Sequence, residues 1–247
     1  MTAVLFIHGF PFDHSMWRQQ VAALARWRCI APDLRGAGTS AGPASPSEYT
    51  VASYAGDLIG LLDELRIQRA VICGLSLGGY IAFELLRSHA ARVRAAVLCN
   101  TKAAADTPEA KRDRDAMAEL ARQRGAGAIA ERLLPKLLSG DTFEQQPEVV
   151  QEVREMITRA SVGGIVGALH ALRERPDSTP VLAMIRVPVL VVAGADDQIA
   201  PAPGMRAMAG AIPGAESVVI PGAGHLAPLE QPVPVNAAIQ RFLEKLG

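Results

Sequence analysis

The stretch that decides the fold reads Val71-Ile72-Cys73-Gly74-Leu75-Ser76-Leu77-Gly78-Gly79. Apolar residues typical of a buried strand precede a serine with a glycine two positions before it and another two positions after it, and residues 77–88 continue with helical spacing. A serine on so tight a strand-to-helix turn has a strained backbone, and bulky neighbours would collide there. Such a turn lifts the hydroxyl above the sheet, with the amino end of a helix behind it. We therefore predict that Ser76 is a nucleophile.

The segments around this turn alternate between strands and helices. Six runs rich in Val, Ile, Leu and Ala predict buried strands at 3–7, 27–31, 70–73, 95–99, 187–193 and 217–220. Segments with helical spacing lie at 16–25, 51–65, 77–88 and 235–246. Continuous apolar runs, rather than alternating ones, suit a parallel sheet covered by helices on both faces. The pattern predicts an α/β fold with a doubly wound, mostly parallel sheet of about six strands.

Residues 102–177 interrupt this alternation. The segment is charged and rich in Ala, Arg and Glu, and it predicts three or four helices at 109–124, 126–138, 148–160 and 163–173. Ordinary crossover helices are the simpler alternative, but one crossover needs only about a dozen residues. We therefore expect a helical cap at 102–177 over one edge of the sheet, inserted before the penultimate strand, with 1–101 and 178–247 forming the core.

A serine hydroxyl is a poor nucleophile until a neighbouring base takes its proton. Of the five histidines, only His225 follows a predicted strand end on a glycine-rich loop, from which it can reach over the sheet. His14 lies in a polar loop, and His89 and His170 lie in or beside predicted helices. We predict His225 as the general base, with a solvated loop histidine as the alternative.

The base needs a carboxylate that accepts from its N–H, holds one tautomer and stabilises the imidazolium. Asp196 and Asp197 both follow the predicted strand at 187–193. The spacing from Gly194 and to Pro201 favours Asp197, and Asp196 remains the alternative.

Backbone N–H groups near the serine can stabilise a developing oxyanion. The amide of Leu77 directly follows the nucleophile, and the loop after the first strand offers a second donor in Phe10. Gly9 permits a sharp turn there, whereas Pro11 has no N–H. His8 could act as a base, but we expect a histidine at this strand end, followed by glycine, to brace the loop.

The composition excludes several classes of protein. The 247 residues include 25 Lys and Arg and 25 Asp and Glu, so the formal net charge is zero. A neutral chain has no positive electrostatic field that would attract nucleic acid. The amino-terminal residues lack a positive leader, and the longest apolar run is too short to span a membrane, so we expect neither a signal peptide nor membrane association. Three cysteines in apolar runs suggest reduced thiols and a cytoplasmic location. Nothing has the spacing of a metal or cofactor site.

The chain resembles the α/β-hydrolase superfamily along nearly its whole length. Ser76, Asp197 and His225 follow strands in that family's order, and residues 7–10 resemble its oxyanion-loop motif. Residues 32–40 resemble its D-x-R-G-x-G-x-S loop, in which the resemblance implies that Asp33 and Arg35 brace rather than react; position 37 is Ala where the family often has His. The cap falls where the family places one. The chain starts at what is usually the third strand, so we expect the antiparallel amino-terminal hairpin to be missing.

The resemblance implies a carboxylic ester hydrolase without a cofactor, either a short-chain esterase or a lactonase, because residues 8–17 look similar to small bacterial esterases and enol-lactonases. Its small-molecule ester or lactone would meet pocket walls formed by Phe10, Phe12, Trp17 and Leu77, with apolar cap residues. Aromatic residues make up only 4% of the chain, which favours a mainly aliphatic pocket and small substrates.

Other functions on this fold remain open. Dehalogenase and epoxide-hydrolase relatives carry an aspartate at the elbow, so Ser76 argues against both. A C–C bond hydrolase or a cofactor-free perhydrolase would use the same triad, and some relatives are small-molecule receptors with a vestigial hydrolase site. The sequence makes no prediction of oligomeric state.

Overall fold

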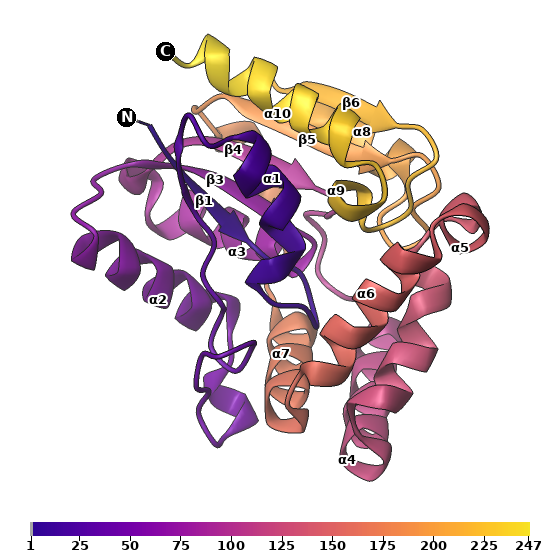
Figure 1. Cartoon of the computed structure of the whole chain (residues 1–247). Helices are drawn as coiled ribbons and strands as arrows, with labels where there is room; N and C mark the ends of the chain where they lie inside the picture. Colours follow the sequence, from indigo (N-terminus) through magenta and orange to yellow (C-terminus); the bar gives the residue numbers. More distant parts are fainter. Residues whose placement is uncertain (1) are drawn as a thin grey trace.

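The computed structural model describes residues 2–247, and its centre is one parallel sheet in the strand order β2-β1-β3-β4-β5-β6 (Figure 1). The strands are β1 Ala3–Ile7, β2 Arg28–Ile30, β3 Ala70–Leu75, β4 Val93–Cys99, β5 Val189–Gly194 and β6 Glu216–Ile220. This confirms the predicted doubly wound sheet of about six strands. The chain reverses direction across the sheet between β1 and β3, and the carboxyl ends of strands at such a switch point commonly border a ligand site.

The strand boundaries differ from the predicted ones where a strand's neighbours decide its length. The edge strand β2 pairs only with β1, over three residues rather than the five predicted, and Arg28 is exposed. The central strands β1, β3 and β5 are buried along their whole length. Burying each large aliphatic side chain there contributes roughly 1.5–3 kcal/mol.

Helices cover both faces of the sheet. They are α1 Arg18–Ala23, α2 Val51–Glu64, α3 Leu77–Ser88, α8 Ala202–Gly210, α9 Ala227–Glu230 and α10 Pro232–Lys245. Helices α1 and α10 contact each other on one face, and α2 and α3 contact each other on the opposite face (Figure 1). Helix α10 begins at Pro232 rather than at 235, because a proline in the first turn has the helical φ and no N–H to lose. Within residues 2–247, no helix is both long and apolar enough to cross a membrane.

Four helices stand between β4 and β5, and we call them the insert: α4 Pro108–Leu137, α5 Gly140–Gln145, α6 Pro147–Arg159 and α7 Val162–Glu174. Gly125, with a φ of 73°, kinks α4 between the two helices predicted there. Helix α5 occupies residues that we expected only to separate helices. Its amino end is capped by Ser139, whose side chain accepts from the amide of Thr142.

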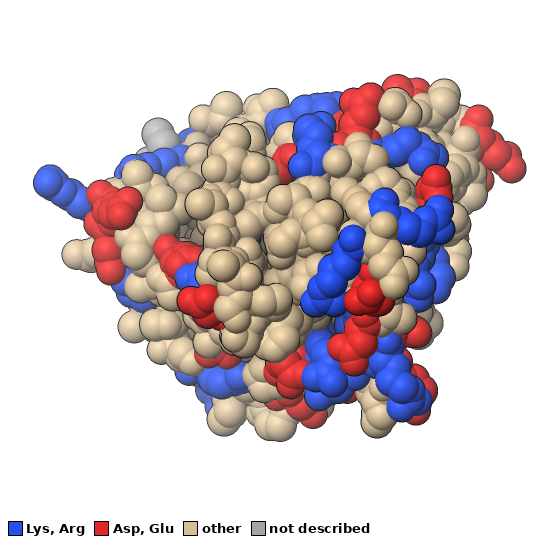
Figure 2. All heavy atoms as spheres, turned by 90° about the horizontal axis from the view of Figure 1, so that it is seen from below, with Lys and Arg blue, Asp and Glu red and all other residues tan. Residues whose placement is uncertain are grey.

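The insert lies over the carboxyl ends of the strands rather than over one edge of the sheet. Its α4 contacts the loop after β6, since the Leu137 carbonyl accepts from the amide of His225 at 2.8 Å. Arg159 of α6 pairs with Asp13 in the segment after β1 at 2.9 Å. Figure 2 shows Lys and Arg interspersed with Asp and Glu around an uncharged centre on the face seen from below. Such mixed charge on this face gives no single-sign field for a polyanion.

Candidate active site

Ser76 lies on the turn between β3 and α3 with φ 52° and ψ −108°, a conformation that is strained for any residue other than glycine. Strain of this kind costs about 1–3 kcal/mol and persists only where the surroundings impose it. Here the amide of Ser76 donates to the Cys99 carbonyl at 3.1 Å, and the Thr101 hydroxyl donates to the Ser76 carbonyl at 2.9 Å. The end of β4 thus holds the turn in place.

The glycines around Ser76 are required by close backbone approach. A methyl group at Gly78 would lie 2.2 Å from the Ile7 carbonyl oxygen in β1, and one at Gly74 would lie 2.3 Å from the Gly78 carbonyl oxygen. A methyl group at Gly79 would meet the Thr101 side chain at 2.5 Å. The crowding inferred from the sequence is therefore present on both sides of the serine.

His225 and Asp197 form a buried pair on the loops that follow β6 and β5. His225 Nδ1 lies 2.8 Å from Asp197 Oδ2, and the two residues are 3% and 4% exposed. Asp196 is exposed, and its amide donates to the Ala223 carbonyl. The structure thus brings Asp197, and not Asp196, to His225.

The carboxylate of Asp197 is held by further donors. Its Oδ1 accepts from the amides of Ile199 at 2.7 Å and Ala200 at 2.9 Å, and its Oδ2 accepts from Asn100 Nδ2 at 2.8 Å. Burial by itself would raise the pKa of Asp197, but the hydrogen bond and charge of His225, together with the Ala200 and Asn100 donors, lower it to about 2. Asp197 is therefore ionised at neutral pH.

Asn100 is a site residue that the sequence analysis missed. It directly follows β4, has a φ of 45°, and donates to the Gly224 carbonyl at 3.1 Å as well as to Asp197. The available signal for Asn100 was a polar residue immediately after an apolar strand, at the carboxyl ends of the strands where the other candidates lie.

The three candidate residues Ser76, Asp197 and His225 follow β3, β5 and β6, whose carboxyl ends lie on one side of the parallel sheet. Within residues 2–247, Ser76 Oγ makes no hydrogen bond to His225. Hydrogen bonds between a nucleophile and its base often shorten only as the substrate binds.

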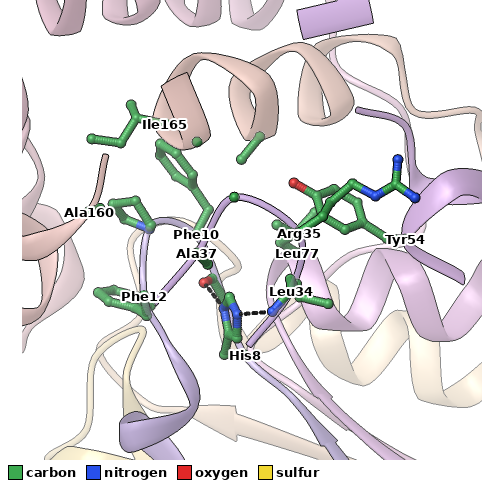
Figure 3. A pocket seen from close by; sticks show the side chains of 15 residues that line it. His8, Phe10, Phe12, Leu34, Arg35, Ala37, Tyr54, Leu77, Ala160 and Ile165 are labelled. Atoms are coloured by element: carbon green, nitrogen blue, oxygen red, sulfur yellow. Dashed lines mark hydrogen bonds between the residues drawn. The ribbon is translucent and has the colours of Figure 1, made fainter. Parts of the chain in front are cut away.

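A pocket with about 320 Å³ of non-atom space, part of it open to solvent, lies beside the elbow, between the core and the insert (Figure 3). Phe10, Phe12 and Leu77 line it from the core. The insert supplies small and aliphatic residues to the pocket wall: Ala160, Gly164, Ile165 and Ala168.

Trp17, which we also expected in the pocket wall, does not line this pocket. The residue is fully buried, and its ring packs on Phe6 with the centroids 5.2 Å apart. Its side chain faces the core because the short helical segment His14–Trp17 turns it toward β1.

The loops beneath the pocket are braced by polar side chains. His8 Nε2 accepts from the Leu34 amide at 3.0 Å, and burial lowers the pKa of His8, which keeps this nitrogen available as an acceptor. These contacts support a bracing role for His8 (Figure 3). Arg35 pairs with Asp57 and also donates to the Glu48 carbonyl at 3.1 Å.

Asp13, His14 and Asp33 place one potential metal-ligand atom each within 4.8 Å of one another. Each carboxylate already has protein partners, since Asp13 pairs with Arg159 and Asp33 accepts from His14 Nδ1 at 2.7 Å. Asp33 also accepts from the Thr39 amide at 2.9 Å, so it braces the loop that contains it. The cluster is explained by these contacts without a cation.

Comparisons with known proteins identify the family. A family model described as alpha/beta hydrolase fold matches residues 2–232. In structure, the chain is similar to a thermophilic esterase from Thermogutta terrifontis, with a TM-score of 0.97 and 43% identity over 100% of this chain and 90% of that one. It is also similar to the enol-lactonase from Burkholderia xenovorans LB400, with a TM-score of 0.91 and 34% identity over 98% and 91% of the two chains.

A curated relative gives the same result from sequence. The 3-oxoadipate enol-lactonase 2 of Acinetobacter baylyi is 30% identical over 99% of this chain and 90% of its own length. These matches span the sheet, the insert and the loops that contain Ser76, Asp197 and His225. The chain therefore belongs to the family with the alpha/beta hydrolase fold.

Proposed function

We propose that the protein is a carboxylic ester hydrolase, either a short-chain esterase or a lactonase, which acts through Ser76, His225 and Asp197. The observation that supports this most strongly is the buried 2.8 Å contact between His225 and Asp197, which lies at the carboxyl ends of the strands, as does the strained serine elbow. The similar proteins include an esterase and enol-lactonases, which favour ester or lactone substrates.

The proposed reaction proceeds through an acyl-enzyme. Because Asp197 is ionised and faces Nδ1 of His225, the proton stays on Nδ1 and Nε2 is left as the base. His225 removes the Ser76 proton as Oγ attacks the ester carbonyl, and it then gives that proton to the leaving alcohol. Water activated by His225 hydrolyses the acyl-enzyme. With a lactone, the alcohol released remains attached to the acyl chain, and the product is a hydroxy acid.

The amides of Phe10 and Leu77 are the proposed oxyanion donors. Within residues 2–247, neither amide donates to a protein acceptor, and both residues line the same pocket beside Ser76. A free N–H aimed at developing negative charge contributes roughly 10²–10³ in rate. All groups that this mechanism uses belong to the chain itself, so no cofactor enters it.

The insert acts in this proposal as a cap. Residues 102–177 would form a separate helical unit over a core of 1–101 and 178–247, with Ala160 and Ile165 closing the pocket above Phe10. Small, mainly aliphatic walls favour short acyl chains or small lactones. The cysteines Cys29, Cys73 and Cys99 are free thiols, which favours the reducing cytoplasm as the location.

The test is hydrolysis of p-nitrophenyl acetate, p-nitrophenyl butyrate and a small lactone by wild type, Ser76→Ala and Ser88→Ala. Ser88 is an exposed serine at the far end of α3, and its variant controls for the loss of a hydroxyl. We expect kcat/KM of Ser76→Ala to fall by at least about 10⁴-fold, with Ser88→Ala within about twofold of wild type.

Full activity in Ser76→Ala would refute the serine mechanism. A folded wild type that turned over none of these substrates would favour the C–C hydrolase or receptor alternatives. Formation of peracid from acetate and hydrogen peroxide, faster than ester hydrolysis, would favour the perhydrolase.

A further inference from the structure

Glu230, at the end of α9, is a buried carboxylate that the mechanism above does not use. The residue is 1% exposed, and within residues 2–247 no lysine or arginine pairs with it. Buried carboxylates are rare unless they are paired or hydrogen-bonded. Four donors satisfy Glu230, and they come from two different parts of the molecule.

One carboxylate oxygen binds the loop that contains His225. Glu230 Oε1 accepts from the amide of Gly224 at 2.9 Å and from the amide of Leu226 at 3.0 Å. These are the residues directly before and after His225. The peptide groups on both sides of the candidate base are therefore held by one oxygen atom.

The other oxygen binds the insert at the junction between α4 and α5. Glu230 Oε2 accepts from the Ser139 amide at 2.7 Å and from the Thr142 hydroxyl at 2.8 Å. The Ser139 hydroxyl donates in turn to the Gly222 carbonyl at 3.1 Å. The carboxylate thus joins the histidine loop to the insert through two independent pairs of contacts.

The loop needs such support because its own sequence does little to restrain it. Gly222 and Gly224 flank Ala223, and Gly222 has a φ of 65°. Catalytic groups must stay within about 0.5 Å of their productive position, which requires side chains fixed by surrounding contacts. Glu230 supplies restraint of that kind on both sides of His225.

We propose that Glu230 is a positioning residue, which holds His225 against Asp197 by binding the amides on either side of it and fixes this loop to the α4–α5 junction. The proposal rests on the proposed role of His225 as the base. Glu230 does not touch the reacting atoms; it acts through the loop.

The experiment compares wild type with Glu230→Gln. Glutamine has nearly the same shape but only one acceptor oxygen, so it can serve the loop or the insert and not both. We expect kcat for p-nitrophenyl butyrate to fall by roughly 10–100-fold while KM stays within about twofold, because a misplaced base slows chemistry more than binding. Ile239→Val, a fully buried change on α10, controls for general loss of stability and should keep wild-type kcat.

A second measurement reports on His225 directly. In wild type, the proton shared by His225 Nδ1 and Asp197 should give a downfield NMR resonance, which should weaken or move in Glu230→Gln and stay unchanged in Ile239→Val. Glu230→Asp keeps both oxygens but is one methylene shorter, so it should lower kcat and disturb the resonance too. This variant serves if Glu230→Gln does not fold.

A folded Glu230→Gln or Glu230→Asp protein with wild-type kcat and an unchanged resonance would overturn the proposal. A fall in kcat with an unchanged resonance would overturn it as well, since His225 would not have moved. Failure of the proposed function looks different: Ser76→Ala would retain activity, or wild type would have none, while the resonance would still report whether Glu230 positions His225.

Discussion

The candidate active site has two halves that are built in different ways. The serine elbow is held by the sheet, through the close approach of Gly78 to Ile7 of β1 and the hydrogen bonds of Ser76 with Cys99 and Thr101 at the end of β4. His225 is held partly by the insert, since its amide donates to the Leu137 carbonyl. We call these the serine half and the histidine half.

The difference shows which half depends on the insert. A change in α4 or α5 reaches His225 through main-chain hydrogen bonds, whereas the serine elbow is fixed by a parallel ladder in which Ile7 pairs with Gly74. Extra movement of the insert should therefore slow proton transfer without deforming the nucleophile. The following predictions test this separation, from the largest expected effect to the smallest.

Asp197→Asn should lower kcat by about 10⁴-fold, whereas Asp196→Asn should stay within about twofold of wild type. Only Asp197 accepts from His225, and an amide in its place would hold the imidazole in the wrong tautomer. Steady-state hydrolysis of p-nitrophenyl butyrate by the two variants measures this directly. If Asp196→Asn were the inactive one, the histidine half would be organised differently from this structure.

Gly78→Ala should be more damaging than Gly224→Ala, although each adds one methyl group. The first methyl meets the Ile7 carbonyl at 2.2 Å, while the second meets the Ser139 amide of the insert at 2.7 Å. Overpacking costs roughly 1–3 kcal/mol, and we expect Gly78→Ala near the top of that range, because β1 is held between two neighbouring strands and cannot yield.

The connection between α4 and α5 is not part of the sheet ladder, so we expect Gly224→Ala to cost only about 1 kcal/mol and to lower kcat by about 10-fold as the His225 loop moves. Urea unfolding and steady-state kinetics of both variants provide the comparison. Equal losses of stability would show that the insert is as rigid as the sheet.

Acid should lower the free energy of unfolding because it protonates Asp197 in the histidine half. Its pKa is lowered from 3.8 to about 2 in the folded protein. A lowered folded pKa stabilises the protein above the unfolded value, and this contribution is lost as the pH falls from about 4 through about 2. The contribution is about 2 kcal/mol at most.

Urea unfolding of wild type and Asp197→Asn between pH 2 and 6 measures this contribution. The free energy of unfolding should fall more steeply for wild type below pH 4, and parallel curves would contradict the lowered pKa. Asp33, whose pKa is also lowered to about 2, is present in both proteins and cancels from the difference.

Features that depend on local chemistry were predictable from the sequence. The run around Ser76 predicts a strand, a turn and a helix, because glycine is required where backbones approach closely and the apolar period changes at the serine. The division of α4 at Gly125 was predictable for the same reason, since a residue with positive φ ends regular helix geometry. The alternation of strands and helices predicted the doubly wound sheet.

Features that depend on long-range contacts were not predictable. Trp17 is an aromatic residue of a kind expected in a pocket wall. Its ring packs on Phe6 instead, because the direction of its side chain depends on how the chain enters α1. Helix α5 begins with Gly140 and Asp141, residue types that are common in turns, and contacts from distant residues, such as Glu230 to Thr142, stabilise it. Nothing near Asn100 in the sequence indicates that it binds Asp197, and nothing near Glu230 indicates that it binds the α4–α5 junction.

By itself, the sequence determined which strand each candidate residue follows: Ser76 follows β3, an aspartate pair follows β5 and His225 follows β6. Apolar period and glycine spacing are local properties, and they suffice for that result. Only the tertiary structure decided that Asp197 rather than Asp196 meets His225, that Asn100 and Glu230 support them, and that the insert takes part. The contacts of His225 with Asp197, of Ser139 with Glu230 and of Asn100 with Gly224 join residues 28 to 124 positions apart, which no local pattern encodes.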